Sequence, residues 1–147
     1  MGTKSFGVTG THGKNFSIQV LGVGEVMRNL RLWNIKINDG ADSGVVKAGA
    51  FIRDEVIESI GGQRAEHQSV DTGVLINDIK FVKTGNASGI VKPGGKSYPG
   101  GQNTKDVATI LEYSKNVVGG PRRHFGNTEK RTKSDVKAII KKAIKVV

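Results

Sequence analysis

The sequence predicts an α+β fold in which a small antiparallel or mixed sheet packs against an N-terminal helix pair and a C-terminal amphipathic helix. Two regions alternate apolar and polar residues, as half-buried strands do, and four others carry apolar residues at helical spacing. The chain has 147 residues, which is the size of one domain. We therefore expect residues 1–147 to form a single α+β domain.

The N-terminal part of the chain predicts an arm, a strand and a helix. Residues 1–15 contain four glycines and no sustained period, so we expect a flexible arm. Residues 16–20 alternate apolar and polar side chains, which predicts a strand. A helix beginning near Glu25 then places four apolar residues along one stripe: Val26, Leu30, Trp33 and Ile37.

A second helix is expected to pack antiparallel to the first. Residues 38–42 predict a turn, and Asp42 or Ser43 can cap the helix that follows. Gly61 and Gly62 end this second helix. Because the connecting turn is short, the two helices should form an antiparallel pair. The apolar stripe of the second helix is Val45, Ala48, Ile52, Val56 and Ile60.

A strand pair is predicted in the middle of the chain. Residues 74–82 predict a strand with Ile79 and Phe81 on one face and with Asp78 and Lys80 on the other. A hairpin loop at residues 84–89 leads into a return strand at 90–91. Residues 93–105 then contain four glycines and two prolines, so we expect a long Gly/Pro-rich loop.

Two further helices complete the chain. Asp106 can cap a short helix whose apolar face contains Val107, Ile110 and Leu111. The sequence Gly119-Gly120-Pro121 prevents its continuation. The final helix carries its apolar stripe at Val136, Ile139, Ile140, Ala143, Ile144 and Val147. The opposite face carries Lys137, Lys141, Lys142 and Lys145, which we call the lysine face.

The positive charge of the protein is concentrated near the C-terminus. The formal net charge is +10, and residues 121–147 contribute nine positive and two negative charges to it. Such a surface can contact nucleic acid, contact an acidic protein or remain in water. The lysine face is therefore the candidate surface for DNA or for an acidic partner.

The residue types that carry most enzyme and metal chemistry are missing or scattered. The chain has no cysteine, and His12, His67 and His124 lack a second ligand at helical or hairpin spacing. No serine has the context of a nucleophile, and no acid/base pair is recognisable. No stretch approaches the roughly 20 apolar residues that a membrane span needs. We expect no enzyme activity, metal, cofactor or membrane contact.

Two short blocks of sequence carry a resemblance to a known family. The first is Thr72-Gly-Val-Leu-Ile-Asn-Asp-Ile79, and the second combines Val107-Ala-Thr-Ile-Leu-Glu-Tyr113 with Arg123-His-Phe125. Together they resemble the tail-completion (head-tail joining, minor tail component) family of long-tailed bacteriophages. In that family a Thr-Gly-x-Leu-x-x-Ser-Ile block precedes Tyr-Ala-x-Tyr-Val-Glu-Phe-Gly and then Arg-Pro-Phe. Asp78, Ser114 and His124 depart from this pattern.

The resemblance implies a structural virion protein, a ring subunit that joins the phage head connector to the tail. It implies a homo-oligomer of six or twelve copies that contacts the head connector or adaptor and the tail tube or tail terminator. The location would be the neck or upper tail of the virion, assembled in the host cytoplasm. Non-specific contact with DNA passing through the channel is possible. A small basic nucleic-acid-binding protein, supported by the C-terminal lysines, is the alternative.

The turn between the last two helices is the candidate subunit interface. Glu112 precedes the glycine turn, and Arg122, Arg123 and Phe125 follow it. The carboxylate and a guanidinium can pair within the turn or across the boundary between adjacent subunits, with Phe125 as an apolar anchor. Both arrangements are expectations for the structure to address.

Overall fold

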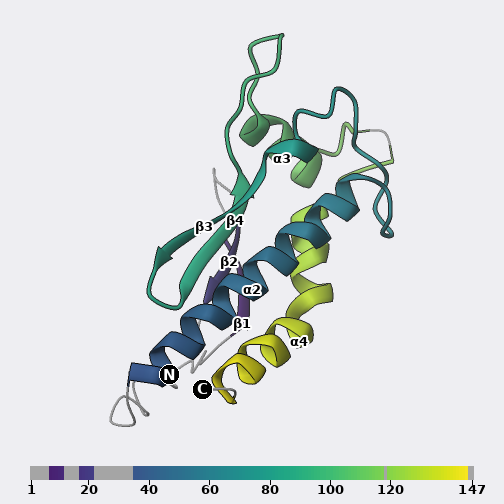
Figure 1. Ribbon diagram of the computed structural model, residues 1–147. Helices are drawn as coiled ribbons and strands as arrows, with labels where there is room; N and C mark the ends of the chain where they lie inside the picture. The colour runs from purple at the N-terminus through teal and green to yellow at the C-terminus, as the bar shows by residue number, and fades with distance from the viewer. Residues whose placement is uncertain (1–6, 12–16, 22–34, 118, 146–147) are drawn as a thin grey trace.

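The computed structural model describes residues 7–11, 17–21, 35–117 and 119–145 (Figure 1). These residues form an α+β domain, as predicted. Its elements in chain order are β1 (Gly7–Thr11), β2 (Ser17–Leu21), α2 (Ile35–Ile60), the short 3-10 helix η1 (Ile76–Asp78), β3 (Ile79–Gly85), β4 (Ser88–Pro93), α3 (Thr104–Tyr113) and α4 (His124–Lys145). No helix in these ranges is long and apolar enough to cross a membrane.

The sheet has four strands in the order β1-β2-β4-β3, and every neighbouring pair is antiparallel. Strand β2 confirms the strand predicted near residues 16–20. The flexible arm expected over residues 1–15 is wrong for residues 7–11, which form β1 and pair along their length with β2. Strand pairing uses backbone groups that every residue possesses, so β1 forms without an alternating pattern of its own.

Both long helices cover the same face of the sheet. α2 packs on β2, β3 and β4, while α4 packs on β1 and β2 (Figure 1). The two helices run antiparallel, because Ser59 near the end of α2 meets His124 at the start of α4. At the opposite end of the pair, Gly44 lies against Ile140. α3 lies at the end of the molecule where α4 begins (Figure 1).

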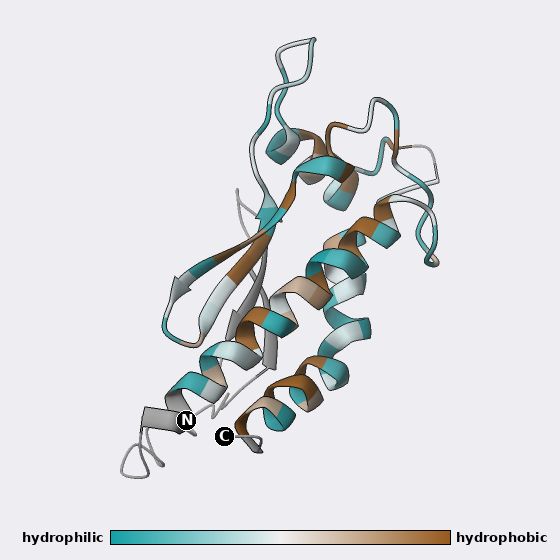
Figure 2. Ribbon diagram, in the orientation of Figure 1, coloured by the Kyte–Doolittle hydropathy of each residue, from teal (hydrophilic) through white to brown (hydrophobic). Residues whose placement is uncertain are grey.

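The core lies between the sheet and these two helices. Every member of the apolar stripe predicted for α2 is fully buried, from Val45 to Ile60. Val136, Ile140 and Ala143 of α4 are buried as well, and Figure 2 shows apolar residues along the facing sides of the helices. Burial of these side chains is the main source of stability for such a two-layer domain.

The turn predicted at residues 38–42 is wrong, because α2 continues through it as one helix of 26 residues. The side chain of Asp42, expected in the turn, is instead held by the β3–β4 hairpin, where it pairs with Lys83 and accepts the backbone N–H of Ala87 at 3.0 Å. Two glycines further along α2 lie at points of close packing. A Cβ added to Gly44 would lie 3.0 Å from the Cβ of Ala143, and one added to Gly49 would overlap the ring of Phe81. The glycines therefore bring neighbouring elements close, and this packing outweighs their low helix propensity.

The predicted N-terminal helix pair is not present within the described ranges. Residues 22–34, which hold most of the first predicted helix, lie outside the described residues. The helix predicted to follow the turn exists, but it begins at Ile35 and packs on α4. Its antiparallel partner is therefore the C-terminal helix.

Three boundaries in the second half of the chain also differ from prediction. β3 begins at Ile79, because the preceding residues form η1, and this places Asp78 in the interior rather than on the outer face. The cap of α3 is Asn103, whose side chain accepts the backbone N–H of Asp106 at 3.0 Å. α4 begins at His124, three turns before the apolar stripe that predicted it.

Candidate functional site

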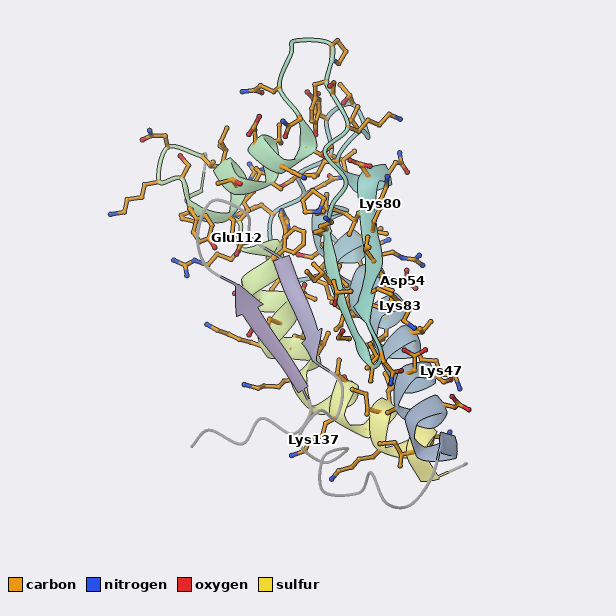
Figure 3. The ribbon with its side chains drawn as sticks, turned by 90° about the vertical axis from the view of Figure 1, so that its left-hand side faces the viewer. Lys47, Asp54, Lys80, Lys83, Glu112 and Lys137 are labelled. Carbon is orange, nitrogen blue, oxygen red and sulfur yellow. The ribbon has the colours of Figure 1, made fainter. Side chains whose placement is uncertain are left out.

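The turn between α3 and α4 is organised by a carboxylate that caps the second helix. The two oxygens of Glu112 accept the backbone N–H groups of Phe125, at 3.0 Å, and Gly126, at 3.1 Å. These donors belong to the first turn of α4, where no helical carbonyl is available to them. A residue near the end of one helix thus fixes the start of the next (Figure 3).

Glu112 is held in the interior of the subunit, with 4% of its surface exposed. Burial raises the pKa of its carboxyl group, opposed by the two backbone hydrogen bonds and by the positive charge of Arg123. A Cβ added to Gly126 would lie 3.0 Å from the Glu112 Oε2 atom. Glycine at position 126 therefore leaves the space in which the carboxylate approaches the helix.

The four predicted interface residues separate into two pairs. Glu112 and Phe125 are buried, so they lie behind the surface that a neighbouring subunit can contact. Arg122 is half-buried and Arg123 is exposed. Arg122 donates from Nη1 to the carbonyl of Gln68, at 2.9 Å. It therefore ties the turn to the loop that follows α2.

A chain of buried and half-buried polar groups runs from this arginine along one face of the first two turns of α4. Its six members are Arg122, Ser69, His124, Ser59, Glu66 and Arg131, and we call it the polar chain. Arg122 Nη1 lies 3.2 Å from Ser69 Oγ, which lies 2.7 Å from His124 Nε2. His124 Nδ1 lies 2.7 Å from Ser59 Oγ. Ser59 donates to Glu66 at 2.5 Å, and Arg131 donates to the same carboxylate at 3.1 Å.

The donor directions in the polar chain fix the tautomer of His124. Because Ser59 uses its only hydrogen on Glu66, the Nδ1 atom of His124 must donate to Ser59. The Nε2 atom then accepts from Ser69. The ring is neutral and both nitrogens are satisfied. Burial, together with the charges of Arg122 and Arg131, lowers the pKa of His124 to about 4, while the charge of Glu66 opposes this shift.

The acidic end of the polar chain remains ionised. Burial raises the pKa of Glu66, but hydrogen bonds from Ser59, Arg131 and Asn127 outweigh it, and the pKa lies below the ordinary value. Its partners Asn127 and Arg131 come from α4. The polar chain therefore joins the end of α2 and the following loop to the first two turns of α4.

The polar chain was not apparent from the sequence because its members come from segments that are far apart in the chain. Ser59 and His124 are 65 positions apart, and Ser59 sits beside the apolar stripe without a pattern of its own. Among the residues that the structure describes, no group of three His, Cys, Asp or Glu side chains is placed to hold a metal ion.

A pocket of about 330 Å³ opens beside Arg122. Its walls come from four segments: the loop after α2, the loop between β4 and α3, one side of α3, and the turn that precedes α4. Its apolar lining includes Leu75, Ile76, Tyr98, Val107 and Leu111, and its polar lining includes Asp71, Gln102 and Arg122. On α3, two further apolar side chains, Ile110 and Tyr113, are each 45% exposed.

This pocket joins the two sequence blocks that carry the family resemblance. Residues 72, 73, 75 and 76 of the first block line it, and so do residues 107 and 111 of the second. The blocks are about 30 residues apart in the chain. Their convergence was not apparent from the sequence, which gave their order but not their distance.

The loop between β4 and α3 is fastened at its base. Asp78 Oδ2 accepts the hydroxyl of Thr104 at 2.6 Å and the backbone N–H of Lys96 at 2.9 Å. Thr104 Oγ1 accepts the N–H of Gly95 at 2.8 Å. Residues 94–103 connect β4 to α3, and Figure 1 shows this loop projecting beyond the rest of the molecule. Its base is a buried latch between Asp78 and Thr104.

The lysine face lies on solvent where the structure describes it. Lys137, Lys141 and Lys142 are exposed, and the side chain of Lys145 lies outside the described residues. Figure 3 shows Lys137 on the side of α4 away from α2. Because α4 begins at His124, the exposed basic surface also includes Lys130 and Lys133, which were not part of the predicted face.

No protein-family model, curated protein sequence or solved structure matches the chain.

Proposed function

We infer that this protein is a structural subunit of a homo-oligomeric ring that joins a phage head connector to the tail. The observation that carries this proposal is the convergence of the two resembling blocks around one pocket. Two short sequence matches support a shared function more strongly when their residues form one surface than when they lie on separate surfaces. The role is mechanical, without catalysis or a cofactor, and the location is the neck or upper tail of the virion.

The site provides what a repeated subunit contact requires. Closure of a ring by head-to-tail contacts needs two different surfaces on each subunit. The pocket supplies a concave surface, and the turn at residues 99–101, between the two loop residues that line the pocket, supplies a projecting one. Glu112 and the polar chain hold the pocket wall at Arg122 in place, so little order has to be gained on assembly.

Within the ring, we expect the pocket rather than the buried Glu112 to form the contact between copies. Neighbouring rings, the connector or adaptor on one side and the tail tube or terminator on the other, would meet the remaining loops. Six or twelve copies would close the ring.

Sedimentation of the purified protein and negative-stain images of it test the proposal. Wild-type protein should form closed rings at assembly concentrations. Thr72→Arg and Gln102→Arg place a long charged side chain at exposed positions of the pocket rim, and each should lower ring yield at least tenfold without lowering the melting temperature. Asn86→Arg, at the exposed hairpin turn, is the matched control and should assemble normally. Normal ring yield in both rim variants would contradict the proposed contact, and a strictly monomeric wild type would contradict the ring.

A further inference from the structure

Four lysines of α4 form one continuous stripe. Lys130, Lys133, Lys137 and Lys141 follow one another at intervals of three, four and four residues, which places them on the same side of a helix. All four are exposed, and we call them the lysine stripe. The opposite side of α4 is buried at Val136, Ile140 and Ala143. The stripe is therefore held on a helix that is fixed along its length.

Much of the negative charge of the domain is occupied elsewhere. Carboxylates pair with cations away from the stripe: Asp42 with Lys83, Asp54 with Arg53, Glu55 and Glu58 with Arg64, Glu66 with Arg131, and Asp78 with Lys80. α4 itself carries seven Lys or Arg residues against Glu129 and Asp135, a net charge of +5. Within the described ranges, no carboxylate lies within 4.0 Å of the ammonium group of Lys130 or Lys133.

We propose that the lysine stripe binds the phosphate backbone of duplex DNA without reading its sequence. The stripe extends over eleven residue steps, or about 16 Å at 1.5 Å per residue. A duplex presents about one negative charge per 1.7 Å of its axis, so several phosphates lie within reach of four ammonium groups along that length. The lysine stripe therefore matches the phosphate backbone in the sign of its charge and in its linear arrangement.

The composition of the stripe favours a duplex over a single strand. Proteins that bind single strands combine basic residues with aromatic side chains on which the bases stack. The stripe contains lysine alone, and neighbouring exposed positions of α4 are Ser134, Asp135 and Ala138. Lysine binds phosphate as a point charge, without the paired hydrogen bonds that read base edges. Contact with the backbone of a duplex is the interaction that this chemistry supports.

Fluorescence anisotropy with two 24-base-pair duplexes of unrelated sequence tests the proposal, using the full-length protein over a range of salt concentrations. The two duplexes should bind equally. Four neutralised phosphates give a slope of about −3.6 in log K against log salt. The triple variant Lys130→Gln, Lys133→Gln, Lys137→Gln should lose about three quarters of that slope and bind at least tenfold more weakly at low salt.

A triple variant of equal charge change is the matched control. Lys96→Gln, Lys105→Gln and Lys115→Gln remove three exposed lysines that lie on α3 or in the loops on either side of it, and this variant should keep most of the affinity and slope. Replacement of the three stripe lysines by arginine should also preserve binding. Equal losses in the stripe and control variants, tighter binding to a single strand of the same length, or no binding at low salt would each overturn the proposal.

The proposal does not depend on the ring. Sedimentation of each variant reports assembly separately from DNA binding. A stripe variant that forms normal rings and has lost DNA binding supports both proposals. DNA binding by a strictly monomeric wild type would support this proposal alone.

Discussion

The carboxylate of Glu112 accepts the backbone N–H of Phe125 at 3.0 Å, so the last turn of α3 determines where α4 starts. The same carboxylate accepts the N–H of Gly126. Helix α4 packs on α2, β1 and β2 and so forms one side of the core. Its position is set at its first residues, where it follows the glycine loop after α3. The hydrogen bonds from the start of α4 to Glu112 therefore help to position the apolar side of α4 against the core.

Removal of the Glu112 carboxylate should lower the free energy of unfolding, and the loss should grow with the number of carboxylate oxygens removed. Glu112→Ala leaves two N–H groups without a partner and should cost about 2 to 3 kcal/mol in the free energy of unfolding. Glu112→Gln keeps one carbonyl oxygen and removes a charge that burial disfavours, so it should cost less, about 1 kcal/mol. Urea denaturation of both variants measures the difference. Equal costs, or a larger cost for glutamine, would contradict this account of the cap.

The His124 imidazole should make stability depend on pH. Its pKa is 6.5 in the unfolded chain and about 4 in the folded one. Between these values the unfolded state binds more protons, so stability is lost as pH falls. From pH 7 to pH 5 this group should account for a loss of about 2 kcal/mol.

Comparison with His124→Asn isolates this contribution, because the variant should lack it over the same interval. His67→Asn, at an exposed histidine, is the control and should follow the wild type. A wild type and a His124→Asn variant with parallel pH curves would show that the histidine does not titrate in this way.

The latch between Asp78 and Thr104 should control the mobility of residues 94–103. Asp78→Ala removes the oxygen that accepts both Thr104 and Lys96, and Thr104→Val removes the hydroxyl at similar volume. Each should cost about 1 to 3 kcal/mol. Hydrogen exchange within residues 94–103 should accelerate more than exchange in α2. Asp106→Asn, exposed on α3, should leave exchange unchanged. Unaltered exchange in both latch variants would refute the role of the latch.

Addition of a methyl group at Gly49 should destabilise the protein although alanine favours helices. The new Cβ would overlap the ring of Phe81, and overpacking costs about 1 to 3 kcal/mol, against a gain of about 1 from helix propensity. Thermal unfolding should therefore show a net loss. Adding Phe81→Leu should recover part of it, because the smaller side chain can move aside. Ser43→Ala, exposed on the same helix, should be neutral or slightly stabilising. A raised melting temperature for Gly49→Ala would contradict the packing argument.

The parts of the fold that were predictable are those with a strong local period. The stripe from Val45 to Ile60 was predicted residue by residue. Of the stripe predicted for the last helix, Val136, Ile140 and Ala143 are buried, Ile139 and Ile144 are half-buried, and Val147 lies outside the described residues. The turn predicted at residues 38–42 failed for a physical reason. Glycine and aspartate favour turns when considered alone, but here Asp42 pairs with Lys83 and accepts the backbone N–H of Ala87, and the local sequence does not contain these partners.

The candidate site was predictable only in part. The turn around Glu112 was identified from the polar residues that flank it, while the partner of its carboxylate was expected to be a guanidinium and is instead the backbone of α4. His124 appeared isolated, since Ser59 and Ser69 come from other segments. Partners separated by more than 50 residues leave no local pattern to read.

The early start of α4 links two surfaces that are otherwise unrelated. The helix begins beside the pocket at Arg122 and carries the lysine stripe further along the same helix. An assembly contact that fixes the orientation of the start of α4 also fixes the orientation of the lysine stripe. If copies of the protein contact one another through the pocket, the α4 helices of all copies make the same angle with the symmetry axis of the ring. The angle at which a duplex can lie against the lysine stripes would then be set by the contact between subunits, independently of DNA binding.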